Sequence, residues 1–259
     1  MTITAVSHPR YREDVDALLA RLEKDHFPAS SLARQPEGSV VARFFQSLLT
    51  SAFQPIVRAA DHAVEGHQAQ LRVYGGGRGA VSPWSLLAQA SDDAHLVQLD
   101  RLSRTLHALN YFSRKDAGRT LFVNVEPRLL TTVRADHGAY FELILGLLGI
   151  PTRRVAIVMP TAGLDEPVTY VRAAISYRIR GYHVYAQLRA DAQADLEHVL
   201  LTDPHYVGFD PARCAEPRRI IDALAHRGSH AVAQRIDDEQ RARDARATGF
   251  HYLQGHFFA

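Results

Sequence analysis

Cysteine is almost absent from the chain, since Cys214 is the only one among 259 residues. A single cysteine cannot form an intramolecular disulfide, which is typical of a protein in a reducing compartment. Long hydrophobic runs are also missing: the most apolar stretch, residues 141–150, is about half as long as a membrane-spanning helix. The first residues lack the apolar core of a signal peptide. We therefore expect a cytoplasmic protein without a membrane span.

An excess of either charge is missing as well. The chain has 30 Lys and Arg residues against 28 Asp and Glu residues, a formal net charge of +2. This balance argues against a nucleic-acid polymer as the partner, because such proteins present a strongly basic face. Lys24 and Lys115 are the only lysines, so arginine supplies nearly all the positive charge. Guanidinium groups bind anions through paired hydrogen bonds, which makes anion-binding groups plentiful.

The first 48 residues differ from the rest of the chain. Apolar side chains recur at helical spacing over residues 11–25 and again over residues 40–49, and a polar loop separates the two stretches. We expect a helical N-terminal extension over residues 1–48 and a second domain over residues 49–259. The extension either packs on that domain or holds a separate partner.

From residue 53 onward, short apolar runs alternate with longer helical patterns. We expect strands at 53–58, 65–73, 120–126, 154–159, 182–188, 205–210, 230–235 and 250–254. Helices fit at 94–113, 137–148, 165–180, 192–201, 215–227 and 237–248. Strands that alternate with helices in this way predict an α/β fold, a (β/α)₈ TIM-like barrel.

The first connection of this barrel is too short for a parallel pair. Six residues, AADHAV, separate the first two predicted strands. A parallel pair needs a crossover of about a dozen residues or more. We therefore expect the first strand to run antiparallel to its neighbours.

At the predicted carboxyl ends of the strands, amides and arginines outnumber carboxylates, of which Glu126 and Asp210 are present. In such barrels the chemistry lies at these ends, and a two-metal hydrolase needs several converging carboxylates there. The sequence also lacks a G-x-S-x-G elbow, and no base is paired with Cys214. His205, His230 and His251 lie at strand starts, at the opposite end of the barrel. We predict no catalytic residues, no metal and no cofactor.

Several segments of the chain resemble the motifs of one family, in the same order and at similar spacing. The chain from about residue 49 to 259 resembles the EAL domain, the bacterial cyclic di-GMP phosphodiesterase module, whose known fold is a (β/α)₈ barrel with one antiparallel strand. The segments that resemble its motifs include FQPIV (53–57), GHQAQLR (66–72), QLDRL (98–102), LFVNVEPRLL (121–130), YHVYAQLRAD (182–191), HYVGFDP (205–211), HAVAQRID (230–237) and TGFHYLQGHFFA (248–259).

The departures from the family pattern concern its metal site. The resemblance implies two divalent ions held by positions that here read Gln68, Asn124, Val158, Gln187 and Leu188, of which only the asparagine is retained. The family's lysine is Gly208, and its glutamate in A-E-G-V-E is Gln234. The resemblance therefore implies an EAL-like domain that has lost hydrolysis.

Positions that the resemblance assigns to ligand contact are better preserved. Gln54 and Asp100 match guanine contacts, and Arg72 matches an arginine that reaches a phosphate; Asn124 and Gln254 are also retained. Arg189 and Arg235 replace small or apolar residues of the family. These two arginines either neutralise phosphates where the metals were, fill the pocket, or form surface ion pairs.

Three functions remain open from the sequence. The first is a cyclic di-GMP receptor that does not hydrolyse its ligand and signals to an unidentified protein partner. The second is a nucleotide-independent pseudoenzyme that regulates a protein by contact. The third, which rests on family membership alone, is a residual phosphodiesterase. Because family barrels often pair, a homodimer is also left open.

Overall fold

The structure of the protein is a computed structural model that describes residues 15–75, 78–82, 86, 92–114, 119–133, 136–189 and 193–259. It divides into two compact units, which are described separately below. The smaller unit comprises Met1–Ser51, Leu71–Lys115 and Phe141–Pro151, and the larger comprises Ala52–Gln70, Asp116–Tyr140 and Thr152–Ala259. Within the described residues, no helix is both long and apolar enough to cross a membrane.

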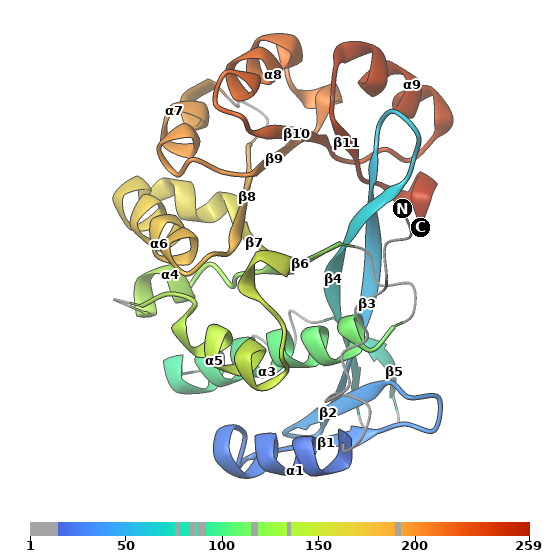
Figure 1. Cartoon of the computed structure of the whole chain (residues 1–259), viewed down its shortest axis with the longest axis vertical. Coiled ribbons are helices and arrows are strands. Elements are labelled where there is room, and N and C mark those ends of the chain that lie inside the picture. Colours follow the sequence, from blue (N-terminus) through green and yellow to red (C-terminus); the bar gives the residue numbers. More distant parts are fainter. Residues whose placement is uncertain are drawn as a thin grey trace, which may run out of the picture. The chain divides into compact units, whose positions relative to one another are not determined.

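The larger unit contains a closed barrel of eight strands, which Figure 1 shows in order from cyan to red. Its strands are β3 (Ser47–Arg58), β4 (Val64–Gly75), β6 (Thr120–Asn124), β7 (Val155–Met159), β8 (His183–Gln187), β9 (Tyr206–Phe209), β10 (His230–Ala233) and β11 (Tyr252–Leu253). The barrel closes because β3 pairs with both β4 and β11. All eight expected strands are present, so the predicted α/β barrel is confirmed.

The first barrel strand runs against the others, as its short connection predicts. The pairs from β4 through β6 to β11 are parallel, whereas β11 pairs with β3 in antiparallel register, with Leu253 opposite Val57. The turn after β3 is closed by Arg58 N, which donates to Ala63 O at 2.9 Å. β3 and β4 therefore form a hairpin rather than a crossover unit.

The interior of the barrel is filled by side chains rather than left as a channel. A buried cluster takes residues from six of the strands: Ile56, Phe122, Ala156, Val158, Tyr185, Tyr206 and Val232. Phe122 packs edge-on against Tyr185 and Tyr206, with ring centroids 5.7 and 5.1 Å apart. This aromatic filling fixes the strands around one packed core, the usual interior of this fold.

Helices alternate with the strands of the larger unit and lie outside its barrel (Figure 1). They are α4 (Leu129–Thr132), α6 (Pro167–Ile179), α7 (Gln193–Leu201), α8 (Pro217–Ala225) and α9 (Glu239–Thr248), with short 3₁₀ turns η3 (Thr161–Asp165), η4 (Pro211–Arg213) and η5 (His256–Phe258). α9 begins where Asp238 accepts a hydrogen bond from Arg241 N, and ends at Gly249 with φ 104°. Each predicted helix of this unit is present within two residues of its expected ends.

The smaller unit combines a hairpin with helices. β1 (Ser30–Arg34) pairs with β2 (Val40–Phe44), which pairs with the start of β3; β5 (Arg78–Val81) pairs with the end of β4. α1 (Val15–His26) packs on β1, and α3 (Asp93–Phe112) packs on β2. Asn110 fixes α3 to β2, since its side chain accepts from Val40 N at 2.6 Å and donates to Val40 O at 2.8 Å. α5 (Ala139–Leu147) is shared between the two units.

The expected helix at residues 40–49 is wrong, and the expected loop before it contains a strand. The segment forms β2 and the start of β3, and its burial alternates with a period of two: Val40, Ala42 and Phe44 are buried. A helix and a pair of short strands can carry similar numbers of apolar residues over ten positions. The spacing of apolar residues alone therefore did not distinguish a helix from strands here. The first predicted helix is present as α1, although residues 11–14 lie outside the described part. The boundary between residues 48 and 49 stays a prediction.

Candidate functional site

The carboxyl ends of the barrel strands surround a cavity lined mainly by glutamines. Gln54 and Gln68 come from β3 and β4, while Gln234 and Gln254 follow β10 and β11 directly. Arg235, Asp237, Gly255 and His256 complete the lining. The cavity measures about 340 Å³, at the low end of the range for ligand sites. All of these residues belong to the larger unit.

Four amide side chains join in one hydrogen-bonded row across this cavity. Gln254 Nε2 donates to Gln54 Oε1 at 3.1 Å and to Gln68 Oε1 at 2.5 Å. Gln68 Nε2 donates in turn to Asn124 Oδ1 at 2.7 Å. Gln254 is 5% exposed, and its own Oε1 is buried without a hydrogen-bond partner among the described residues. The structure thus brings together three predicted ligand residues, Gln54, Asn124 and Gln254.

Tyr185 occupies the space beside Gly208 at the same end of the barrel. A Cβ atom added to Gly208 would overlap the hydroxyl and ring carbons of Tyr185. The Tyr185 hydroxyl accepts a hydrogen bond from Gln234 Nε2 at 2.9 Å, and burial raises the pKa of this phenol above its usual value. Tyr185 therefore stays protonated and neutral at this position, and it excludes any longer side chain from residue 208.

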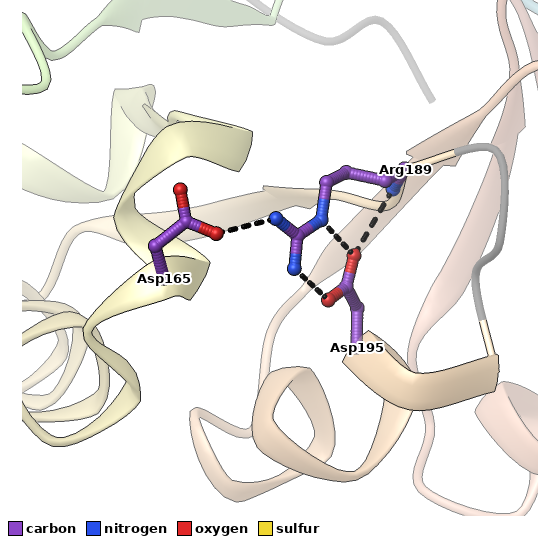
Figure 2. Close-up of polar contacts among 3 residues, drawn as sticks. All are labelled: Asp165, Arg189 and Asp195. Carbon is purple, nitrogen blue, oxygen red and sulfur yellow. Dashed lines mark hydrogen bonds and ion pairs between the residues drawn. The ribbon is translucent and has the colours of Figure 1, made fainter.

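Arg189 does not face the cavity as a free cation. Figure 2 shows its guanidinium held between two carboxylates from different elements. Arg189 Nε and Nη2 donate to Asp195 at 2.9 and 2.7 Å, and Nη1 donates to Asp165 at 2.6 Å. These hydrogen bonds to carboxylates raise the pKa of Arg189 further above its already high value. Of the alternatives that the sequence left open for Arg189, the structure shows ion pairing.

Two predicted ligand residues, Arg72 and Asp100, belong to the smaller unit. Arg72 is exposed on β4. Asp100 lies on α3 with its side chain only 11% exposed, and its carboxylate forms an ion pair with Arg104 Nη2 at 2.7 Å. Arg104 is equally buried, so Asp100 is neutralised within its own helix.

Cys214 and the strand-start histidines have structural surroundings. Cys214 is partly buried after η4, and burial raises the pKa of its thiol, which disfavours the reactive thiolate. His205 Nδ1 accepts from Val184 N at 3.3 Å, and His251 Nδ1 accepts from Ala231 N at 3.0 Å. Both histidines thus complete backbone hydrogen bonding at the amino ends of the strands.

Comparison with known families identifies the family to which the domain belongs. The model of the EAL domain matches residues 42–259. The chain belongs to the EAL domain family. No curated protein matches the chain. The EAL match begins inside β2, so the family segment includes part of the hairpin that precedes the barrel.

Solved EAL structures share this fold at low sequence identity. The FimX EAL domain from Pseudomonas aeruginosa bound to c-di-GMP is 13% identical, with 94% of each chain covered and a TM-score of 0.66. The Bacillus subtilis YkuI protein, in complex with substrate c-di-GMP and calcium, is 18% identical over 80% of this chain and 54% of its own, with a TM-score of 0.66. The EAL enzyme Bd1971 in its cAMP-bound form is 17% identical over 82% of this chain, with a TM-score of 0.67, and this chain spans 62% of its length.

Sequence reasoning missed the packing of Tyr185 and the ion pairs of Arg189. Tyr185 on β8 fills the space beside Gly208 on β9. The two residue types are readable from the sequence, but their contact needs the fold. The partners of Arg189 were not readable either, because Asp165 lies 24 residues away and reaches it only through the fold.

Proposed function

We propose that this EAL domain binds cyclic di-GMP without a metal ion and does not hydrolyse it. The observation that carries the proposal is the chemistry of the metal-ligand positions. Gln68, Asn124 and Gln187 offer neutral amides, and Val158 and Leu188 are apolar. Magnesium and calcium prefer carboxylate oxygens, so these residues do not fit a pair of divalent ions. No group of His, Cys, Asp and Glu that could hold a metal occurs in the described ranges.

The packing of Tyr185 beside Gly208 supports the same proposal. Tyr185 takes the volume beside residue 208, where the family carries its lysine, and it is fully buried and hydrogen-bonded to Gln234. Replacing Gly208 alone would not make room for a lysine, because Tyr185 fills the space beside it. Metal activation of water and neutralisation of transition-state charge supply much of the acceleration in phosphodiester hydrolysis. Without those groups we expect no turnover.

The cavity nevertheless keeps groups suited to a nucleotide. Gln54, Gln68 and Gln254 present amide donors and acceptors, and Arg235 adds a cation. A ligand site needs only a few well-placed polar groups to orient its ligand. Asn124 lies beside them through Gln68. The roles of Arg72 and Asp100 stay predictions from the sequence. The phosphodiester groups of cyclic di-GMP are anionic, and the cavity offers them four amides and a guanidinium against one carboxylate, Asp237.

One observation favours a second candidate, a nucleotide-independent regulator that acts through protein contact. The groups proposed for the guanine are already engaged: Asp100 pairs with Arg104, and Gln54 Oε1 accepts from Gln254. A ligand must displace these contacts, which lowers its affinity. The exposed apolar side chains of α6, Val168 and Ile179, offer surface for a protein partner.

The test is calorimetric titration of the whole chain with cyclic di-GMP in EDTA, together with a hydrolysis assay in magnesium and in manganese. We expect binding in the micromolar range, no turnover, and weaker binding by the Gln54→Ala variant. Gln240→Ala is the matched control, because Gln240 is an exposed glutamine on α9 that bonds to Asp244. Absence of heat up to tens of micromolar ligand would instead favour the protein-contact regulator. Turnover would overturn the proposal.

A further inference from the structure

Arg235 has a backbone conformation that an arginine rarely adopts. It directly follows Gln234 at the end of β10 and has φ 58°, in the left-handed region that favours glycine. The resemblance of residues 230–237 to the family's A-E-G-V-E motif implies a glycine at this position. A side chain at such a φ destabilises the fold relative to glycine, and strained residues gather at functional sites.

The neighbouring backbone holds Arg235 in this conformation. Gln234 N donates to Phe209 O at 2.9 Å, and Ile236 N donates to Gln254 O at 3.0 Å, so both flanking residues are fixed to adjacent strands. Gly255 packs so closely that a Cβ atom there would overlap the backbone of Ile236. The left-handed turn therefore belongs to the fold, and the arginine side chain is an addition to it.

The guanidinium of Arg235 differs sharply from that of Arg189. Arg189 has carboxylates on both sides, whereas the Arg235 guanidinium makes no hydrogen bond to any residue of the described part of the chain. Its one ion pair, to Asp210 at 3.8 Å, is beyond hydrogen-bond distance, and its side chain is 62% exposed. The Asp210 carboxylate already accepts from Ala212 N at 3.0 Å. Arg235 thus lines the cavity with its donors available.

Arg235 is the arginine among the residues that line the cavity, so it supplies the permanent positive charge there. Asp237 Oδ1 is engaged by His256 N at 3.2 Å, and the rest of the polar lining consists of four glutamine amides and His256. A guanidinium fork matches the paired oxygens of a phosphate, and amides add neutral donors around it.

We propose that Arg235 is the phosphate-binding group of this cavity, taking the anionic charge that metal ions neutralise in hydrolysing EAL domains. This rests on the proposed function, which makes the ligand a phosphodiester. The inference names a residue that the family motif lacks. It explains why the chain retains an arginine where glycine fits the backbone better.

The experiment compares Arg235→Gly with Arg213→Ala. Arg213 is a matched control, because it lies 3.8 Å from the same Asp210 carboxylate and is 60% exposed, yet it does not line the cavity. Each variant is titrated in EDTA with cyclic di-GMP and separately with pyrophosphate, and its unfolding in urea is followed. We expect Arg235→Gly to bind both ligands roughly tenfold or more weakly while unfolding at equal or higher urea. Arg213→Ala and Arg235→Lys should bind more tightly than Arg235→Gly.

The outcomes separate this inference from the proposed function. Cyclic di-GMP binding that Arg235→Gly leaves unchanged would overturn the role of Arg235 and leave the receptor standing. Arg235-dependent binding of pyrophosphate without any binding of cyclic di-GMP would support the phosphate site and overturn the receptor. If the native chain binds neither ligand, both are overturned. The equal or higher stability of Arg235→Gly excludes unfolding as the cause of weaker binding.

Discussion

At the scale of single residues, Tyr185 and Gly208 act as one unit. The phenol ring fills the room that a side chain at 208 would need, and its hydroxyl meets both Gln234 and the backbone of Gly208. A change at either position therefore changes the environment of the other. Tyr185 fills the space beside Gly208, so the interior of the barrel is closely packed at this point.

This coupling predicts the behaviour of a double-mutant cycle. Gly208→Ala should lower the free energy of unfolding by about 1–3 kcal/mol, because the added Cβ overpacks against the Tyr185 hydroxyl. Tyr185→Phe should lower it by about 1 kcal/mol through loss of the Gln234 hydrogen bond. The double variant should be more stable than the sum of the two effects predicts, since removing the hydroxyl removes the closest of the methyl group's overlaps and leaves only those with the ring carbons. Urea denaturation of the four proteins measures the coupling, and strict additivity would contradict it.

At the scale of elements, two successive parts of the barrel repeat one histidine arrangement. His205 and His251 each precede a strand. Each donates its backbone N–H to the carbonyl of one residue in the preceding strand, Val184 for His205 and Ala231 for His251. The histidine ring then accepts a hydrogen bond from the backbone N–H of that residue. The strands that receive them, β8 and β10, both begin with histidine. His183 stacks on His205 with centroids 4.1 Å apart, and His230 meets His251 edge-on at 5.3 Å. We call His205 and His251 the strand-clamp histidines.

The strand-clamp histidines make stability depend on pH. Each ring must be neutral to accept a backbone N–H. Burial, with His183 and Arg178 nearby, lowers the pKa of His205 to about 4, and burial lowers that of His251. The unfolded chain then binds protons more readily, so stability is complete above about pH 6.5 and falls as the pH drops toward 4. Both residues are partly exposed, so after discounting for solvent screening we expect a loss of about 1–2 kcal/mol.

Urea unfolding at about pH 7.5 and about pH 5 measures this effect. The paired variant His205→Asn with His251→Asn keeps an oxygen that can accept the backbone N–H but removes the titration, so its stability should change less between the two conditions. His226→Asn, at an exposed histidine after α8, is the control and should keep the native pH dependence. An equal loss in native and paired-variant proteins would refute the role of the clamps.

Much of this element order could be predicted from the sequence, for reasons specific to barrels. The strands of the larger unit are short apolar runs bounded by amphipathic helices, and the six residues between the first two predicted strands already required a hairpin. β1 was missed because it carries few apolar residues, whereas β2 was taken for part of a helix because Phe44 and Phe45 also fit a helical spacing. At the site, the amides were identified by position, but the row linking Gln54, Gln68 and Gln254 needed the fold.

At the scale of the whole molecule, the barrel and its cavity depend on one strand pair, β3 with β11, which we call the seam. β3, near the start of the family segment, pairs with β11 at its end, with Tyr252 opposite Arg58. Gln54 and Gln254 meet across this seam although they are 200 residues apart. The cavity is therefore assembled only when the barrel closes, which couples ligand binding to the integrity of the complete fold.

The seam predicts that the last residues are indispensable to both folding and binding. A chain ending at Thr248 lacks β11 and the buried Leu253 and Gln254, so β3 and β10 lose their shared neighbour. We expect loss of the cooperative unfolding transition in circular dichroism and loss of cyclic di-GMP binding. Leu253→Ala provides a milder test: it should lower stability by about 2–5 kcal/mol through the cavity it leaves, yet keep the transition. Removal of Ala259 alone is the control, because its backbone N bonds only within the final turn, to His256 O. A cooperative transition retained by the chain ending at Thr248 would show that the barrel does not need this seam.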